Sequence, residues 1–255
     1  MAIASFLFNN LGKVTLNHIG VVNEIGAPSG GAGQYTIITN QNELQLIATQ
    51  DAGKKADIYV NGIGVSLKQA GSNFAYNRLQ RSEMLDVFTT LGFEDPDSKL
   101  ATIDNEVNGF HTGTIKGRSR PWNNFFSEND FKILVRFLMM EGSPNLGFSN
   151  HPANLILLAP SSNISQANIE VYTFDEYFEW FKQNLFFAIR RQWIGQSSGE
   201  HTRALGFANK PGNMKWIYDD IKGSPRVSKT TKLKWRLEYE EKDRKTVYMI
   251  FIEKK

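Results

Sequence analysis

Residues 54–69 have the sequence Lys54-Lys55-Ala56-Asp57-Ile58-Tyr59-Val60-Asn61-Gly62-Ile63-Gly64-Val65-Ser66-Leu67-Lys68-Gln69, which predicts a tight β-hairpin. Asn61-Gly62 is a strong signal for a two-residue type I′ turn, because both central residues of that turn need positive φ. Side chains alternate between the two faces of a strand, so Asp57 is expected beside Tyr59 on one face, and Ser66 beside Lys68 on the returning strand. The opposite, apolar face is expected to pack on the core and to consist of Ala56, Ile58, Val60, Val65 and Leu67.

A carboxylate and an ammonium on one rigid face are groups that phosphodiester hydrolysis can use. Asp57 can hold a divalent cation, which acts as a Lewis acid and lowers the pKa of a bound water. Lys68 can orient or deprotonate that water and stabilise the transition state. Mg²⁺ prefers oxygen ligands and keeps several of its waters, so one or two carboxylates suffice. The alternative interpretation is a surface hairpin with an ordinary Asp and an ordinary Lys.

Two short motifs carry a resemblance to a known family. Ala56-Asp57-Ile58-Tyr59-Val60 followed by Val65-Ser66-Leu67-Lys68-Gln69 resembles the core of the PD-(D/E)XK nucleases, in particular the type II restriction endonucleases. The lead-in of residues 54–58 and the polar, aromatic continuation of residues 69–77 are similar to theirs as well. The resemblance covers about residues 51–81. It implies an α/β fold with a mixed central β-sheet flanked by helices, a Mg²⁺ cofactor and double-stranded DNA as the partner.

The same resemblance assigns roles to the hairpin residues. Asp57 would bind the metal, Lys68 would orient or activate water, Ser66 would assist through its hydroxyl or backbone, and Gln69 would support the phosphate. Ser66 stands where the family has a second acid, so a further carboxylate is expected from elsewhere. Glu43, on a predicted short helix of residues 40–48, is the first candidate, with a solvated helix residue as the alternative interpretation. Asp51 is the second candidate.

DNA contacts are expected on both sides of the catalytic stretch. Residues 74–91 read as a helix that leaves the active site, and a second basic cluster follows in residues 109–122. In the nuclease interpretation the contacts near the site come from Asn73, Tyr76, Arg78, Arg81, Lys116, Arg118 and Arg120.

The C-terminal part is strongly basic. Between residues 203 and 236 nine Lys or Arg stand against two acids, among Gly, Pro, Asn and Ser that indicate loops such as residues 206–213. Arg and Lys pair with guanine edges and Asn with adenine, so base contacts are predicted for Arg203, Asn209, Lys210 and Arg226. Phosphate contacts are predicted for Lys229, Lys232 and Lys234. The alternative is a solvated charged face.

These observations predict a nuclease core over residues 1–193, with an irregular insertion of short strands at about 93–126, and a basic, β-rich DNA-recognition lobe over residues 194–255. Strands are expected at 154–160 and 169–172, and helices at 128–140 and 174–193.

The composition agrees with a soluble cytoplasmic protein, because the sequence has no long apolar run and no leader. The absence of cysteine excludes disulfides and thiolate zinc sites. The predicted activity is therefore Mg²⁺-dependent, restriction-type cleavage of double-stranded DNA. A repair or recombination nuclease and a non-catalytic DNA-binding protein remain as alternatives, and the oligomeric state, monomer or homodimer, remains open.

Overall fold

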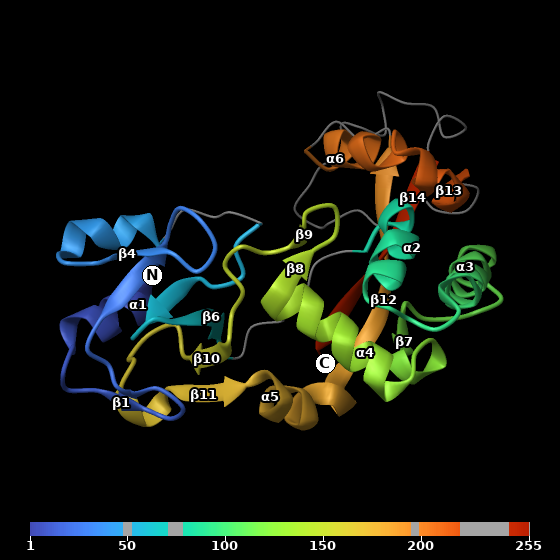
Figure 1. Cartoon of the computed structure of the whole chain (residues 1–255). Coiled ribbons are helices and arrows are strands. Elements are labelled where there is room, and N and C mark those ends of the chain that lie inside the picture. The colour runs from blue at the N-terminus through green and yellow to red at the C-terminus, as the bar shows by residue number, and fades with distance from the viewer. Residues whose placement is uncertain (48–52, 71–78, 195–198, 220–244, 255) are drawn as a thin grey trace. The chain divides into compact units, whose positions relative to one another are not determined.

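The chain folds into two compact units (Figure 1). The computed structural model describes residues 1–47, 53–70, 79–194, 199–219 and 245–254. Unit 1 consists of residues 1–77, 131–185 and 254–255, and unit 2 consists of residues 78–130 and 186–253. The division at residue 193 stays a prediction.

Unit 1 is built on a six-stranded sheet with the strand order β11-β10-β6-β5-β3-β4. β10 runs parallel to β6, whereas the other neighbouring pairs are antiparallel. This confirms the predicted α/β class with a mixed central sheet flanked by helices. The strands of this sheet are β3 (Ile25–Pro28), β4 (Tyr35–Ile37), β5 (Ile58–Val60), β6 (Ile63–Gln69), β10 (Leu155–Ala159) and β11 (Glu170–Thr173).

Helices and short hairpins complete unit 1. Its helical elements are α1 (Ala2–Asn9), η1 (Gln41–Leu46), the π-helical η3 (Phe137–Glu141), η4 (Gln166–Asn168), α5 (Phe174–Phe181) and η5 (Lys182–Asn184). Two small hairpins are formed by β1 (Thr15–Leu16) with β2 (Gly20–Val21) and by β8 (Gly142–Ser143) with β9 (Gly147–Phe148). Helix α4 (Glu128–Arg136) enters unit 1 at Phe131, and Ser127 caps it by accepting a hydrogen bond from the Asp130 N–H at 3.1 Å, as the sequence predicts.

The predicted hairpin is confirmed as β5–β6, with Asn61-Gly62 as its two-residue turn. Both turn residues have positive φ, 48° at Asn61 and 79° at Gly62. The Asn61 side chain ties the turn to the preceding chain: its Oδ1 accepts from the N–H groups of Asn23 and Glu24, and its Nδ2 donates to the Val21 carbonyl at 2.7 Å. The turn residue thus also positions the chain that enters β3.

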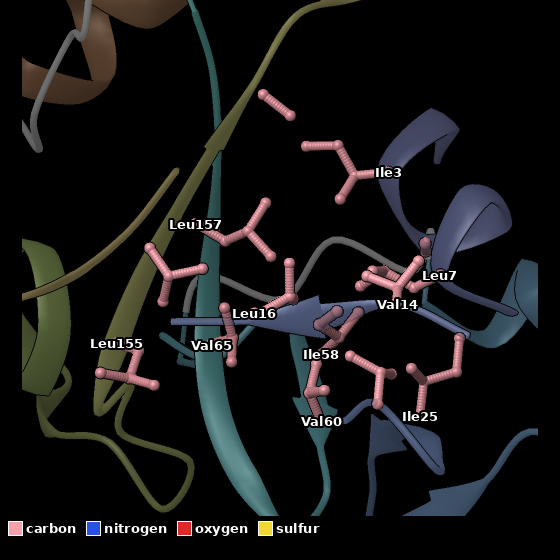
Figure 2. Close-up of a cluster of buried hydrophobic side chains, with 14 of the residues drawn as sticks. Ile3, Leu7, Val14, Leu16, Ile25, Ile58, Val60, Val65, Leu155 and Leu157 are labelled. Atoms are coloured by element: carbon pink, nitrogen blue, oxygen red, sulfur yellow. The ribbon is translucent and has the colours of Figure 1, made fainter. Parts of the chain in front are cut away.

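The core of unit 1 lies on one face of this sheet (Figure 2). Figure 2 shows side chains of β5, β6 and β10 together with Ile3 and Leu7 of α1. Leu44 of η1 belongs to the same cluster, so α1 and η1 cover this face. Four of the five residues predicted for the apolar face lie in or against the cluster, namely Ile58, Val60, Val65 and Leu67.

Ala56 is buried on the other face instead, which corrects its predicted position. Its Cβ lies about where a side chain at Gly64 would point, 3.2 Å from an ideal Cβ at that glycine. A Cβ at Gly64 would also lie 2.6 Å from the Pro152 carbonyl oxygen. Glycine therefore lets the chain before β10 cross close to β6, where the Asn154 N–H donates to the Gly64 carbonyl at 2.7 Å.

β10 is the buried apolar strand that the sequence predicts, and all five of its residues are buried. Ile156 and Leu158 point away from the α1 cluster, toward the face on which α5 packs. The predicted helix of residues 174–193 was wrong beyond Phe181. After the single turn η5, the chain forms β12 (Leu185–Ile194), because its backbone pairs with β7 and β14.

Unit 2 combines a four-stranded sheet, in the order β13-β14-β12-β7, with helices. No helix in the described ranges is long and apolar enough to cross a membrane. The elements of unit 2 are α2 (Arg81–Thr90), α3 (Pro96–Thr112), β7 (Ser119–Pro121), η2 (Trp122–Asn124), β12 from Phe186 onward, α6 (Gly199–Ala208), η6 (Pro211–Trp216), β13 (Ile217–Asp219) and β14 (Lys245–Lys254).

Two secondary-structure predictions for unit 2 need correction. The segment 93–126 was predicted as irregular with short strands, but half of it is helix α3, and β7 is the one short strand that the structure describes there. Leu100, Ile103 and Val107 supply a buried face at helical spacing, and Gly113, with φ 80°, ends the helix. The loop predicted for 206–213 belongs to α6 and η6.

The turn generates a stability prediction. Asn61→Gly permits the positive φ but removes three hydrogen bonds, so it should lower the free energy of unfolding by about 1–2 kcal/mol. Asn61→Asp keeps the two acceptor interactions and should cost less. Urea denaturation of both variants and the wild type checks the order of their free energies of unfolding. Equal stability of Asn61→Gly and the wild type would show that only the turn conformation matters.

Candidate active site

The candidate site forms where β5 and β6 separate. β6 continues for four residues beyond its last pairing with β5, Ile58 with Val65, and runs on beside β10 alone. At this point the Asp57 carboxylate takes the place of a strand partner: its Oδ2 accepts from the Leu67 N–H at 2.6 Å and from the Ser66 hydroxyl at 3.4 Å. The sequence-predicted pairing of Asp57 with the Ser66 strand is thereby observed directly.

Lys68 follows Ser66 on the same side of β6. Its side chain is half-buried beside Leu158, its partner in β10. Burial lowers the pKa of the Lys68 ammonium, and the Asp57 charge partly opposes this by raising the pKa. The structure therefore brings Asp57, Ser66 and Lys68 together. Gln69, at the exposed end of β6, is the last residue of this strand.

Lys55 is a second lysine at this site, and sequence reasoning missed it. Burial is the main cause that lowers the pKa of its ammonium to about 8, the Lys68 charge lowers it further, and the Asp57 charge raises it. The Lys55 Nζ donates to the Leu138 carbonyl of η3 at 2.9 Å. The signal in the sequence was the Lys54-Lys55 pair directly before Asp57, which the family resemblance treated only as a lead-in.

His151 fixes the segment that carries these groups. Its backbone carbonyl accepts from the N–H groups of Lys55 and Ala56 at 3.0 and 2.9 Å. Its buried ring contacts the Tyr59 hydroxyl, with 3.1 Å between Nδ1 and Oη, and Tyr59 stacks on Tyr35 at a centroid distance of 4.7 Å. Positioning of this kind agrees with the structural role that the sequence predicts for the histidines.

Within the part of the chain that the structure describes, Asp57 is the one carboxylate placed to hold a metal at this site. Among the described residues no three His, Asp or Glu side chains form a metal-binding cluster. Within the same ranges only Leu67 and Ser66 hydrogen-bond to the Asp57 carboxylate, and both use Oδ2. The remaining oxygen, Oδ1, fits a Mg²⁺ ion that keeps most of its waters and takes a substrate phosphate oxygen as a further ligand.

Neither of the two acids predicted to complete the metal site is seen beside Asp57. The Glu43 carboxylate accepts from the N–H and the hydroxyl of Thr39 at 2.8 and 3.0 Å, and these hydrogen bonds lower the pKa of its carboxyl group. No hydrogen bond joins it to Asp57, and its helix η1 packs through Leu44 on the other face of the sheet. Its metal-binding role stays a prediction. Asp51 lies outside the described residues.

The predicted DNA contacts fall into three groups. Three of these cations are held by acids: Arg81 by Asp104, Arg120 by Glu106 and Lys210 by Glu83. Four other residues have exposed side chains, namely Lys116, Arg118, Arg203 and Asn209. The remaining predicted contacts lie outside the described residues, namely Asn73, Tyr76, Arg78, Arg226, Lys229, Lys232 and Lys234.

Comparisons with known proteins give one structural similarity. No protein-family model matches the chain, and no curated protein matches it in sequence. The chain is similar to a crystal structure of restriction endonuclease MspI in complex with its cognate DNA. The match covers 98% of this chain and 77% of that chain, with 13% sequence identity and a TM-score of 0.35.

Proposed function

We propose that this protein is a Mg²⁺-dependent endonuclease that hydrolyses phosphodiester bonds in double-stranded DNA, of the type II restriction kind. The observation that carries the proposal is the joint position of Asp57 and Lys68 beside the diverging ends of β5 and β6. There β6 pairs with β10 alone. The half-buried Lys68 ammonium is influenced by the charge of the Asp57 carboxylate, whose Oδ1 accepts no hydrogen bond from the described residues. The sequence resemblance of residues 51–81 to the PD-(D/E)XK nucleases supports the same assignment.

The chain's own groups divide the work. Mg²⁺, when bound, would supply Lewis-acid polarisation of the phosphate and a more acidic water. Asp57 would hold the metal through Oδ1, while Leu67 fixes its other oxygen in place. Lys68 would orient the attacking water and stabilise the negative charge that develops on the phosphate. Ser66 would keep Asp57 oriented through its hydroxyl, and Gln69 would support the phosphate from the exposed end of β6.

A specific observation also favours a second candidate, a DNA-binding protein without catalysis. Ser66 stands where the family pattern has an acid, and among the described residues Asp57 is the one carboxylate at the site. Incubating the protein with Mg²⁺ and unmethylated plasmid separates the candidates. Discrete fragments indicate a restriction enzyme, nicking only at branched or damaged structures indicates a repair or recombination nuclease, and intact DNA indicates binding alone.

The roles of Asp57 and Lys68 can be tested with variants that preserve the local structure. Asp57→Asn keeps an oxygen that can accept from Leu67 N–H but loses the charge, and Lys68→Met keeps the length of the side chain. Each should slow cleavage about a thousandfold, which corresponds to about 4 kcal/mol of lost transition-state stabilisation. Single-turnover cleavage rates measure the loss, and duplex binding in Ca²⁺ should stay within about threefold of the wild type. Cleavage at near wild-type rates by either variant would show that the site is assigned wrongly.

Glu43→Gln tests whether Glu43 completes the metal site. Because Glu43 lies on η1, which packs on the other face of the sheet, we expect an unchanged Mg²⁺ concentration at half-maximal cleavage. Cleavage measured across a Mg²⁺ series checks this. A shift of the curve to higher Mg²⁺ would instead support the sequence prediction that Glu43 is a ligand.

Lys116 and Arg118 are the exposed cations that we propose as phosphate contacts in unit 2. Replacing either by Ala should weaken binding to cognate and scrambled duplexes alike. It should also lower the slope of log affinity against log salt concentration by about one. Lys13→Ala removes the same charge from an exposed position of unit 1 and serves as the control. If both Ala variants behaved like Lys13→Ala in salt titrations, these side chains would be part of a solvated face.

A further inference from the structure

Two consecutive lysines, Lys54 and Lys55, hold their ammonium groups in different places. The backbone N–H groups of Lys55 and Ala56 both donate to the His151 carbonyl, which fixes the direction of the chain just before Asp57. Lys54 Nζ donates to the Pro28 carbonyl at the end of β3, at 2.9 Å. Lys55 Nζ instead donates to the Leu138 carbonyl at 2.9 Å, in a position where the charges of Asp57 and Lys68 both influence it. Only Lys55 therefore belongs to the candidate site.

The Lys55 ammonium is half-buried and has no ion-paired carboxylate among the described residues. It has three N–H donors, and one of them is used by the Leu138 carbonyl. No carboxylate within the described ranges forms an ion pair with it, whereas Lys99, Lys132, Lys182 and Lys210 each have such a partner there. A partly desolvated cation without a paired anion is costly, and the cost falls when an anion binds.

The charges at the site point to the anion. Asp57 contributes one negative charge, whereas Lys55 and Lys68 contribute two positive charges, so the site has a net charge of +1 when all three are ionised. Ser66 adds no charge. A site of this sign attracts a phosphate of the DNA backbone before any metal is bound, whereas a site with two carboxylates and one lysine would repel it.

We propose that Lys55 is a second phosphate-binding lysine of this site, which holds the DNA backbone beside Asp57 and Lys68. This inference rests on the proposed function and deepens it, since it adds a substrate-positioning residue that the nuclease motif does not contain. Lys68 then acts on the attacking water, and Lys55 holds the phosphate in place through the N–H groups that Leu138 leaves available.

Lys55→Met and Lys54→Met form a matched pair for the test. Both remove one positive charge, from adjacent residues whose ammonium groups each donate to a backbone carbonyl. Lys55→Met should weaken binding of a 20-base-pair duplex in EDTA about fivefold to twentyfold and lower the salt slope by about one, whereas Lys54→Met should leave both unchanged. Lys55→Arg keeps the charge and should restore most of the affinity.

A second measurement excludes a purely structural role. Removing a positive charge near Asp57 should lower the Mg²⁺ concentration at half-maximal cleavage about twofold to tenfold, because the cation no longer repels the metal. Weaker DNA binding together with tighter Mg²⁺ dependence is the expected signature of Lys55→Met. A structural defect would weaken both or change neither, and the thermal midpoint of each variant checks that it folds.

The outcomes separate this inference from the proposed function. If the wild type cleaves DNA but Lys55→Met binds the duplex like Lys54→Met, the role of Lys55 is overturned and the nuclease assignment stands. If the wild type binds DNA without cleaving it and Lys55→Met still lowers affinity and salt slope, the phosphate site stands and the nuclease assignment fails. A wild type that does not bind DNA overturns both.

Discussion

The hydrogen bond from the Leu67 N–H to the Asp57 carboxylate is the interaction on which the candidate site depends. It forms where β5 stops pairing with β6, so a side chain takes over the acceptor that a backbone carbonyl would supply in a longer strand. An exposed strand edge is a liability in itself. Here the Asp57 carboxylate accepts the hydrogen bond that the β6 edge donates through the Leu67 N–H. Its other oxygen, Oδ1, accepts none from the described residues and can bind a ligand.

The rest of unit 1 keeps β6 in place so that this separation can exist. On one edge β6 pairs in parallel with the fully buried β10, and on one face Val65 packs into the cluster covered by α1 and η1. Gly64 allows the segment before β10 to pass close to β6. His151, which lies in that segment, accepts hydrogen bonds from the backbone N–H groups of Lys55 and Ala56. The core therefore fixes the two sides of the site through separate elements.

Local signals predicted the hairpin well, whereas long-range contacts determined what the sequence could not show. The turn at Asn61-Gly62 and the opposition of Asp57 and Ser66 follow from the positive φ and the two-residue alternation of strands, which act within a few residues. The residues of β12 were predicted as a continuation of the helix that begins at Phe174, and pairing with β7 and β14 makes them a strand. Similarly, the acids that pair with Arg81 and Arg120 lie 23 and 14 residues away.

The difference between local signals and long-range contacts also explains why the motif did not identify Lys55 as a site residue. It further explains why a serine at position 66 is compatible with the proposed mechanism. A motif compares residue types at fixed spacing, but the side-chain direction of Lys55 is set by His151, almost a hundred residues later in the chain. In the proposed mechanism, the one carboxylate and two lysines that the described residues supply would favour binding of phosphate over binding of metal. A serine beside Asp57 adds no negative charge that would oppose the phosphate, so the loss of the second acid and the presence of the second lysine act in the same direction. Binding of the DNA backbone then brings the additional oxygen ligand that a single-carboxylate metal site requires.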